Sequence, residues 1–415
     1  MDSAISNDTK LAVARDLLEY YRCPEEYATV SAETPGSSEG SERPDYFRRE
    51  RYAKDSVKSN ATGGMKGLVR NAYYLARPLM PVGIRRHLQR MHLRGWEQIE
   101  FPRWPVDRTV EAIVENLLVA SLKTHSLSKV PFIWFWPDGH KSCAIMTHDV
   151  ETESGRDFCS ELMDINDRRE IKSSFQIVPE KRYAVAPAFL NSIKDRGFEI
   201  NVHDLNHDGH LFSQYDRFRN RADRINHYGR EYGAAGFRAA VLYRNPDWLG
   251  ALEFSYDMSF PNVAHLDPQR GGCCTIMPFF IGQILELPLT ATQDYSLFHV
   301  LNDYSLDLWK RQIALVTEKH GLVSFIVHPD YIIENRARKT YENLLDYLAL
   351  LRSDNQIWVP LPGEVNRWWR QRGKMTLRFE SGKWSVHGEG SERARVAYGT
   401  LIDGKLQYIF DTAIA

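Results

Sequence analysis

The chain has 415 residues, of which 43% are apolar and 26% are charged, and its formal net charge is -1. This balance suits a soluble globular protein of two or three units and gives no indication of nucleic-acid binding. No stretch approaches the roughly 20 uninterrupted apolar residues of a membrane span, and the N-terminus lacks the features of a signal peptide. We therefore expect a cytoplasmic protein. Its five cysteines should be reduced thiols, because they are odd in number, show no metal-ligand spacing and include the vicinal pair Cys273-Cys274, a poor candidate for an ordinary disulfide.

The first third of the chain is predicted to be helical with a linker. Apolar residues at helical spacing predict helices over residues 9–22 and 109–122. Residues 31–45 are rich in Ser, Gly, Glu and Pro and should form a linker or loop. The basic stretch over residues 65–94 is compatible with an arm packed across the neighbouring domain, or with a helix that binds a membrane surface or a partner.

Strand and helix patterns then alternate over the middle of the chain. Strands are predicted at residues 143–151, 174–178, 198–202, 236–240, 254–258, 284–287 and 322–327. Helices are predicted at residues 156–170, 187–196, 213–232, 304–319 and 341–351. Such alternation indicates an α/β fold whose parallel sheet is wound either into a barrel or into a doubly wound layer. From Lys374 the period changes to two, with Ser-Gly and Asp-Gly turns, which predicts a small antiparallel sheet.

The first chemical cluster ends the strand at residues 143–151, Cys-Ala-Ile-Met-Thr-His-Asp-Val-Glu. Alternation along an extended strand puts Asp149 and Glu151 on the same side. Two such carboxylates can divide their roles, one holding a metal ion while the other stays free as a base. The alternative interpretation is a loop whose acids cap the following helix.

The second cluster follows another predicted strand and reads Asn-Val-His-Asp-Leu-Asn-His-Asp-Gly-His, residues 201–210. The spacing of His203 and His207 would put both imidazoles on one face of a helical turn, within reach of one ion. With an acid at the other strand end, the pattern predicts a site of two histidines and one carboxylate that leaves room for water. An open position of this kind distinguishes a catalytic zinc site from a structural one.

These clusters resemble the first two motifs of the polysaccharide deacetylase family, the NodB-homology carbohydrate esterases. Residues 147–151 are similar to a variant of the Thr-Phe-Asp-Asp motif in which the metal-binding acid lies two residues beyond the base. The resemblance thus implies Asp149 as the base and Glu151 as a metal ligand. It implies His203 and His207, which match the His-x-x-x-His motif, as the other two ligands.

Three further motifs extend the resemblance over residues 140–355. Gly-Phe-Arg at 236–238 is similar to the third motif, whose arginine, here Arg238, holds the catalytic aspartate. Residues 255–261 resemble the fourth, a wall of the groove, and His328 matches the fifth, whose histidine protonates the leaving amine. The chain departs from the family in having Glu151 where Asp is usual. It also has Ala240 where the third motif has a proline, which precedes the N–H group thought to bind the oxyanion.

The resemblance implies a distorted (β/α) barrel of the NodB-homology type over residues 131–360. A helical and linker extension over 1–130 and a helix with β-hairpins over 361–415 would flank it. The implied function is removal of an N-acetyl group from an N-acetylated sugar in a glycan or glycolipid precursor, with a divalent ion, most simply Zn²⁺, as cofactor. The alternative is a catalytically weakened barrel that keeps its metal and acts as a glycan-binding or scaffold protein.

Overall fold

The computed structural model describes residues 7–29, 43–53, 91 and 93–410. The predicted linker and the basic stretch over residues 65–94 fall largely outside these ranges. In the described part of the chain, no helix is long and apolar enough to cross a membrane. All five cysteines are buried and free, as predicted.

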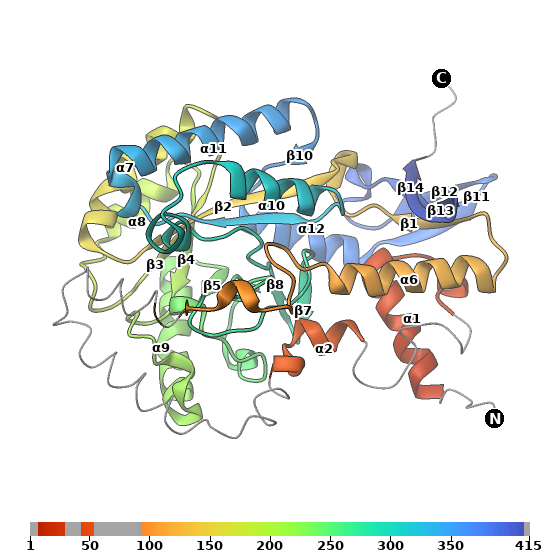
Figure 1. Cartoon of the computed structure of the whole chain (residues 1–415), viewed down its shortest axis with the longest axis horizontal. Coiled ribbons are helices and arrows are strands. Elements are labelled where there is room, and N and C mark those ends of the chain that lie inside the picture. Colours follow the sequence, from red (N-terminus) through yellow and green to blue (C-terminus); the bar gives the residue numbers. More distant parts are fainter. Residues whose placement is uncertain (1–6, 30–42, 54–90, 92, 411–415) are drawn as a thin grey trace.

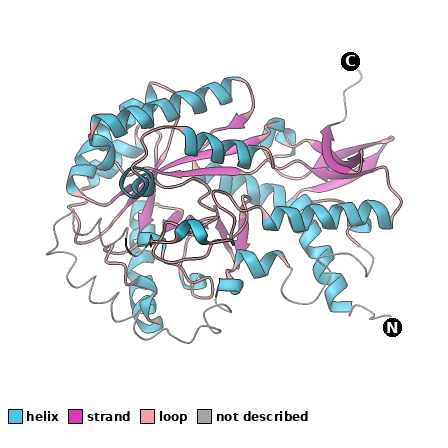
Figure 2. Cartoon of the chain, in the orientation of Figure 1, coloured by secondary structure: helices cyan, strands magenta, loops and turns pink. Residues whose placement is uncertain are grey.

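The main sheet is built from parallel strands, shown in magenta in Figure 2. Its strands are β2 (Ser142–Val150), β3 (Ser174–Ile177), β4 (Glu199–His203), β5 (Gly236–Arg238), β6 (Tyr256–Asp257), β8 (Ile284–Glu286), β9 (Leu322–Ile326) and β10 (Ile357–Trp358), with β7 (Phe279–Ile281) antiparallel to β8. Strand β2 is buried along its whole length. This agrees with the apolar run at residues 143–146, which is typical of a strand covered on both faces.

The sheet closes on itself. Strand β9 pairs with β2 on the side opposite β3, because Thr147 has a partner in each of them. Beyond β8, the N–H of Ala291 donates to the carbonyl oxygen of Ser324 in β9 (3.1 Å). The hydroxyl of Thr290 donates to Leu322 O (2.8 Å) and accepts from Ser324 N (2.9 Å). The strands therefore form a distorted (β/α) barrel, which confirms the predicted fold class.

The predicted helices between the strands are also present, and Figure 1 shows α7, α10 and α11 beside the strands. These helices are α7 (Glu153–Asp167), α8 (Pro187–Lys194), α9 (Tyr215–Tyr232), α10 (Asp307–Thr317) and α11 (Asn335–Ser353). Helix α11 begins earlier than predicted. The cause is its N-cap: the carboxylate of Glu334 accepts the N–H groups of Arg336 and Ala337.

A smaller sheet away from the barrel pairs a strand that precedes the barrel with two strands of the C-terminal tail (Figure 1). It joins β1 (Lys129–Ile133) to β13 (Val396–Ile402) and β14 (Lys405–Phe410), while β11 (Thr376–Glu380) and β12 (Lys383–His387) form a separate hairpin. Ser381-Gly382 and Asp403-Gly404 form the predicted turns with positive φ. The predicted boundary at residue 131 falls inside β1, which pairs with the C-terminal tail.

Three helices connect this sheet to the barrel: α1 (Asn7–Tyr21), α6 (Thr109–Thr124) and α12 (Pro362–Lys374). The guanidinium of Arg372 on α12 is buried and donates to the carbonyl oxygens of Trp134 (3.0 Å), Ile133 (2.8 Å) and Tyr20 (2.9 Å). Burial lowers the pKa of Arg372 to about 9. This one side chain therefore ties α12 to α1 and to the end of β1.

Candidate active site

The first acidic pair lies where β2 leaves the barrel. Asp149 is in the strand and Glu151 follows its last residue. The N-cap of α7 is Thr152, whose hydroxyl accepts the N–H of Gly155 (3.1 Å). Neither acid is therefore used as the helix cap.

The two histidines come together in a different way from the predicted helical turn. His203 is the last residue of β4, and His207 lies in the loop that follows, with φ 54°. Asp204 is also left-handed (φ 55°), and its N–H donates to Arg238 O (2.8 Å). The helical-turn prediction is wrong, because this hydrogen bond turns the chain back across the end of β5 before a helix can begin. The two rings nevertheless lie with centroids 4.8 Å apart.

Three imidazoles converge on one carboxylate oxygen. From Glu151 Oε1, the Nε2 atoms lie at 2.7 Å in His207, 3.3 Å in His328 and 3.5 Å in His203. The donor atoms of Glu151, His203 and His207 lie within 4.8 Å of one another, and so do those of Asp149, Glu151 and His328. These side chains come from the carboxyl ends of β2, β4 and β9, the end at which parallel barrels carry their chemistry.

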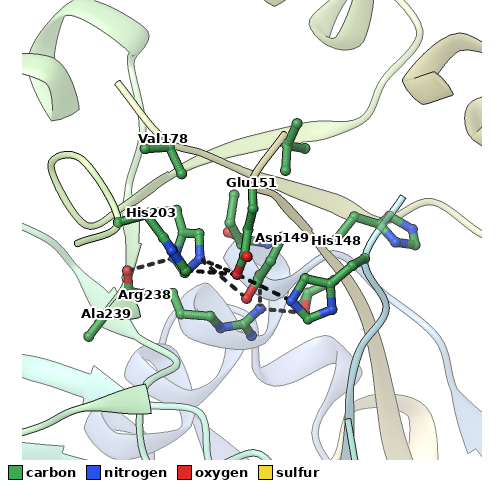
Figure 3. A network of polar contacts seen from close by, with 12 residues as sticks. His148, Asp149, Glu151, Val178, His203, Arg238 and Ala239 are labelled. Atoms are coloured by element: carbon green, nitrogen blue, oxygen red, sulfur yellow. Dashed lines mark hydrogen bonds and ion pairs between the residues drawn. The ribbon is translucent and has the colours of Figure 1, made fainter. Parts of the chain in front are cut away.

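Arg238, at the end of β5, holds Asp149. Its Nη1 donates to Asp149 Oδ1 (2.6 Å) and to Thr147 Oγ1 (2.8 Å), and its Nε donates to Met258 O (2.9 Å). Figure 3 shows Asp149 and Arg238 facing each other beside Glu151 and His203. Burial alone would raise the pKa of Asp149, but Arg238 and the nearby histidines outweigh it and lower that pKa. Asp149 is thus ionised and fixed in position.

Asp294 was not anticipated from the sequence, and it orients His328. Its Oδ1 accepts from His328 Nδ1 (2.6 Å) and its Oδ2 from the His328 backbone N–H (2.7 Å). Burial would lower the pKa of His328, but Asp294 and Glu151 raise it well above its usual value. The only signal in the sequence is an acid after β8 that caps the next helix, at the same end of the barrel as the other clusters.

The remaining histidine nitrogens fit a cation. Nδ1 of His203 donates to Arg238 O (3.1 Å), which turns Nε2 toward the acids. That Nε2 atom and both ring nitrogens of His207 are buried and make no well-aligned hydrogen bond among the described residues, although both Nε2 atoms lie close to Glu151 Oε1. Burial would raise the pKa of Glu151, but His207 and His328 bring it well below its usual value. One carboxylate and two such imidazoles could hold a divalent metal ion, and imidazole nitrogen suits zinc.

Strand β5 leads into a tight turn. Val241 and Leu242 both have positive φ, at 58° and 53°. The N–H of Val241 has no acceptor among the described residues, whereas that of Leu242 bonds to Ala239 O (3.3 Å). The turn therefore leaves one backbone donor unpaired close to Arg238.

The neighbouring polar residues form a separate network on the other side of β2. Nδ1 of His148 donates to Val327 O (2.9 Å), and its Nε2 accepts from Asn166 Nδ2 (3.3 Å). Asn166 in turn accepts from the hydroxyl of Tyr341 (2.5 Å). Figure 3 shows His148 pointing away from Asp149. Asp208 pairs with Arg221 (2.6 Å) outside the cluster.

No protein-family model and no curated protein sequence matches the chain. Solved structures are similar to its barrel. A candidate polysaccharide deacetylase from Mycobacterium smegmatis is 18% identical, with a TM-score of 0.48, and the match covers 60% of this chain and 98% of that one. A candidate polysaccharide deacetylase from Pseudomonas aeruginosa PAO1 is 12% identical, with a TM-score of 0.45, covering 57% and 93%. PuuE allantoinase is 11% identical, with a TM-score of 0.45, covering 57% and 92%.

Proposed function

We propose that the protein is a metal-dependent hydrolase that removes the N-acetyl group from an N-acetylated sugar. The observation that supports this most strongly is the arrangement around Glu151 Oε1. A candidate metal site lies between an ionised aspartate held by an arginine and a histidine held by an aspartate. Hydrolysis of an amide needs these three parts: electrophilic activation, a base and an acid.

Asp149 is the proposed base. Arg238 keeps it ionised at neutral pH and fixes the carboxylate, so that its second oxygen can take a proton from the attacking water. That oxygen, Oδ2, lies 3.6 Å from His203 Nε2, which puts it beside the candidate metal ligands. A positioned base of this kind contributes about 10²–10⁴-fold to the rate.

His328 is the proposed acid. Its Nδ1 is held by Asp294, which fixes the ring and directs Nε2 toward Glu151. The raised pKa keeps a proton on the ring at neutral pH. The protonated ring can therefore give that proton to the nitrogen that leaves as the amide bond breaks, which balances the proton taken by Asp149.

Glu151, His203 and His207 are the proposed metal ligands. A bound divalent ion supplies Lewis acidity to water and to the substrate carbonyl. The unpaired N–H of Val241 is the proposed donor to the developing oxyanion, in the position where the related family has the residue after its proline. Ala240 in place of that proline keeps this donor, because the N–H belongs to the next residue.

The substrate class rests on the motif resemblance. An N-acetylated sugar in a glycan or glycolipid precursor is the substrate that a cytoplasmic deacetylase would meet. The proposed division of the chain gives the chemistry to residues 131–360 and leaves both extensions outside the ligand set. Within the described residues, each metal-compatible cluster draws its members from the barrel.

The test is metal analysis of the full chain followed by acetate release from a panel of N-acetylated sugars. Asp149→Asn should keep its metal while turnover falls by about 10²–10⁴-fold, because only the base is lost. Asp208→Asn is the matched control, since Asp208 pairs with Arg221 outside the cluster. Equal acetate release from wild type and Asp149→Asn, or no release from any sugar, would instead support a binding or scaffold protein.

A further inference from the structure

The turn after β5 is strained. A positive φ is uncommon outside glycine, and for a β-branched residue such as Val241 it is a genuine outlier. Two consecutive residues in this region destabilise the turn, so their surroundings must hold them. The segment in question directly follows Arg238 and carries the unpaired N–H of Val241.

Arg244 holds the second strained residue. Its Nη1 donates to Leu242 O (2.9 Å). The backbone of Arg244 is fixed in turn by Gln269, whose side-chain oxygen accepts the Arg244 N–H (3.1 Å) and whose amide donates to Arg244 O (3.2 Å). Gln269 therefore fixes the backbone position from which the Arg244 side chain reaches Leu242 O.

The partner of Arg244 comes from the N-terminal extension. Arg244 Nε donates to both carboxylate oxygens of Glu50 (2.9 and 3.0 Å), and Nη2 donates to Oε1 (2.5 Å). The two side chains are 0% and 6% exposed. Gly271 closes over the pair: a Cβ there would lie 3.2 Å from Glu50 Oε1 and 3.5 Å from Arg244 Nη2. The contact is therefore tight and dry.

The segment that carries Glu50 is itself tied to α1. Glu50 follows α2 (Pro44–Arg48) and donates its N–H to Phe47 O (2.8 Å). Arg48 pairs with Glu19 (3.2 Å), and Arg43 pairs with Asp16 (3.1 Å). These contacts, together with the hydrogen bond from the Tyr52 hydroxyl to Gly272 O (2.7 Å), place the carboxylate of Glu50.

Stability is a poor explanation for this buried pair. Taking two charges out of water costs several kcal/mol per ion, and replacing a buried pair by apolar residues is often neutral or stabilising. The pair instead fixes the orientation of the Arg244 guanidinium. In that orientation its Nη1 donates to Leu242 O.

We propose that Glu50 is a positioning residue for the deacetylase site: through Arg244 it holds the left-handed turn at Val241 and Leu242 and so keeps the Val241 N–H in place. This inference rests on the proposed function. It makes the N-terminal extension a working part of the site, although that extension supplies no metal ligand.

The decisive variant is the double substitution Glu50→Met and Arg244→Leu in the full chain. It removes the charges together and should fold with an unchanged melting temperature and metal content. The kcat for acetate release from an N-acetylglucosamine oligomer should fall at least 10-fold and up to the roughly 10²–10³-fold that one oxyanion donor contributes, with KM little changed. The single variant Glu50→Asp keeps a carboxylate for Arg244, so its kcat should fall less than that of the double variant.

The matched control is Glu115→Leu with Lys319→Met, which removes another ion pair between the N-terminal extension and the barrel (2.8 Å) without touching the Glu50 segment or the turn. It should leave kcat unchanged. A wild-type kcat in the Glu50 and Arg244 double variant would overturn the proposal. If the wild type releases no acetate, the proposed function fails, and a crystal structure of the double variant still tests the clamp. In that structure Val241 and Leu242 should relax to negative φ. Retention of their present values of 58° and 53° would overturn the proposed clamp.

Discussion

The two sides of strand β2 hold histidines of the same burial but opposite chemistry. On one side, His148 has both ring nitrogens paired with neutral groups, and burial lowers its pKa to about 4. On the other side, the Nε2 atoms of His203 and His207 face carboxylates without a well-aligned hydrogen bond to them. Burial would lower the pKa of His203, but Asp149 and Glu151 raise it. A buried histidine with matched neutral partners is structural, whereas one with unmet nitrogens beside acids indicates a ligand.

The largest effect should come from removing an unmet imidazole. His207→Ala leaves one imidazole and one carboxylate, too few to hold zinc tightly, so bound metal and acetate release should be lost together. Metal analysis and activity are measured on the same preparation. His210→Ala, in the same loop but outside the cluster, should keep both. A fully active, metal-loaded His207→Ala variant would show that His207 is not a metal ligand and would contradict the contrast drawn with His148.

A smaller effect should follow from loosening a partner of the site. Asp294→Asn keeps the shape of the contact to His328 but removes the charge that raises its pKa. We expect kcat to fall by about 10–100-fold, the usual effect of changing such a supporting contact, while bound metal is unchanged. Steady-state kinetics with metal analysis checks this. Equal kcat in the variant would mean that His328 needs no support from Asp294.

The smallest effect on activity should come from the other side of β2. Tyr341→Phe leaves the buried oxygen of Asn166 without its donor, which costs about 1–3 kcal/mol of unfolding free energy. Activity per folded molecule should be unchanged. Denaturant unfolding and specific activity measure the two. Tyr347→Phe, on the same helix but half-buried, should change neither. A loss of kcat in a folded Tyr341→Phe protein would show that the His148 network also contributes to catalysis and would contradict this prediction.

The sequence predicts the strands that lead to the site, because apolar runs that stop at polar clusters are local signals. It also brings together Asp149, Glu151, His203 and His207, since parallel strands end at one rim. It misplaces the histidine loop, because the hydrogen bond from Asp204 to Arg238 O depends on a neighbouring strand. Asp294 carries only the weak signal of a helix cap, and Glu50 carries no local pattern. Their roles follow only from partners distant in the chain, and pattern reasoning cannot see those contacts.

Arg372 also constrains the order in which the protein can assemble. The carbonyl oxygen of Tyr20 that it binds lies 352 residues earlier in the chain. At a synthesis rate of about 5–20 residues per second, the N-terminal helix waits roughly 20–70 s before α12 exists to fix it. Helix α1 is therefore synthesised long before the residue that fixes it to α12 and to the end of β1.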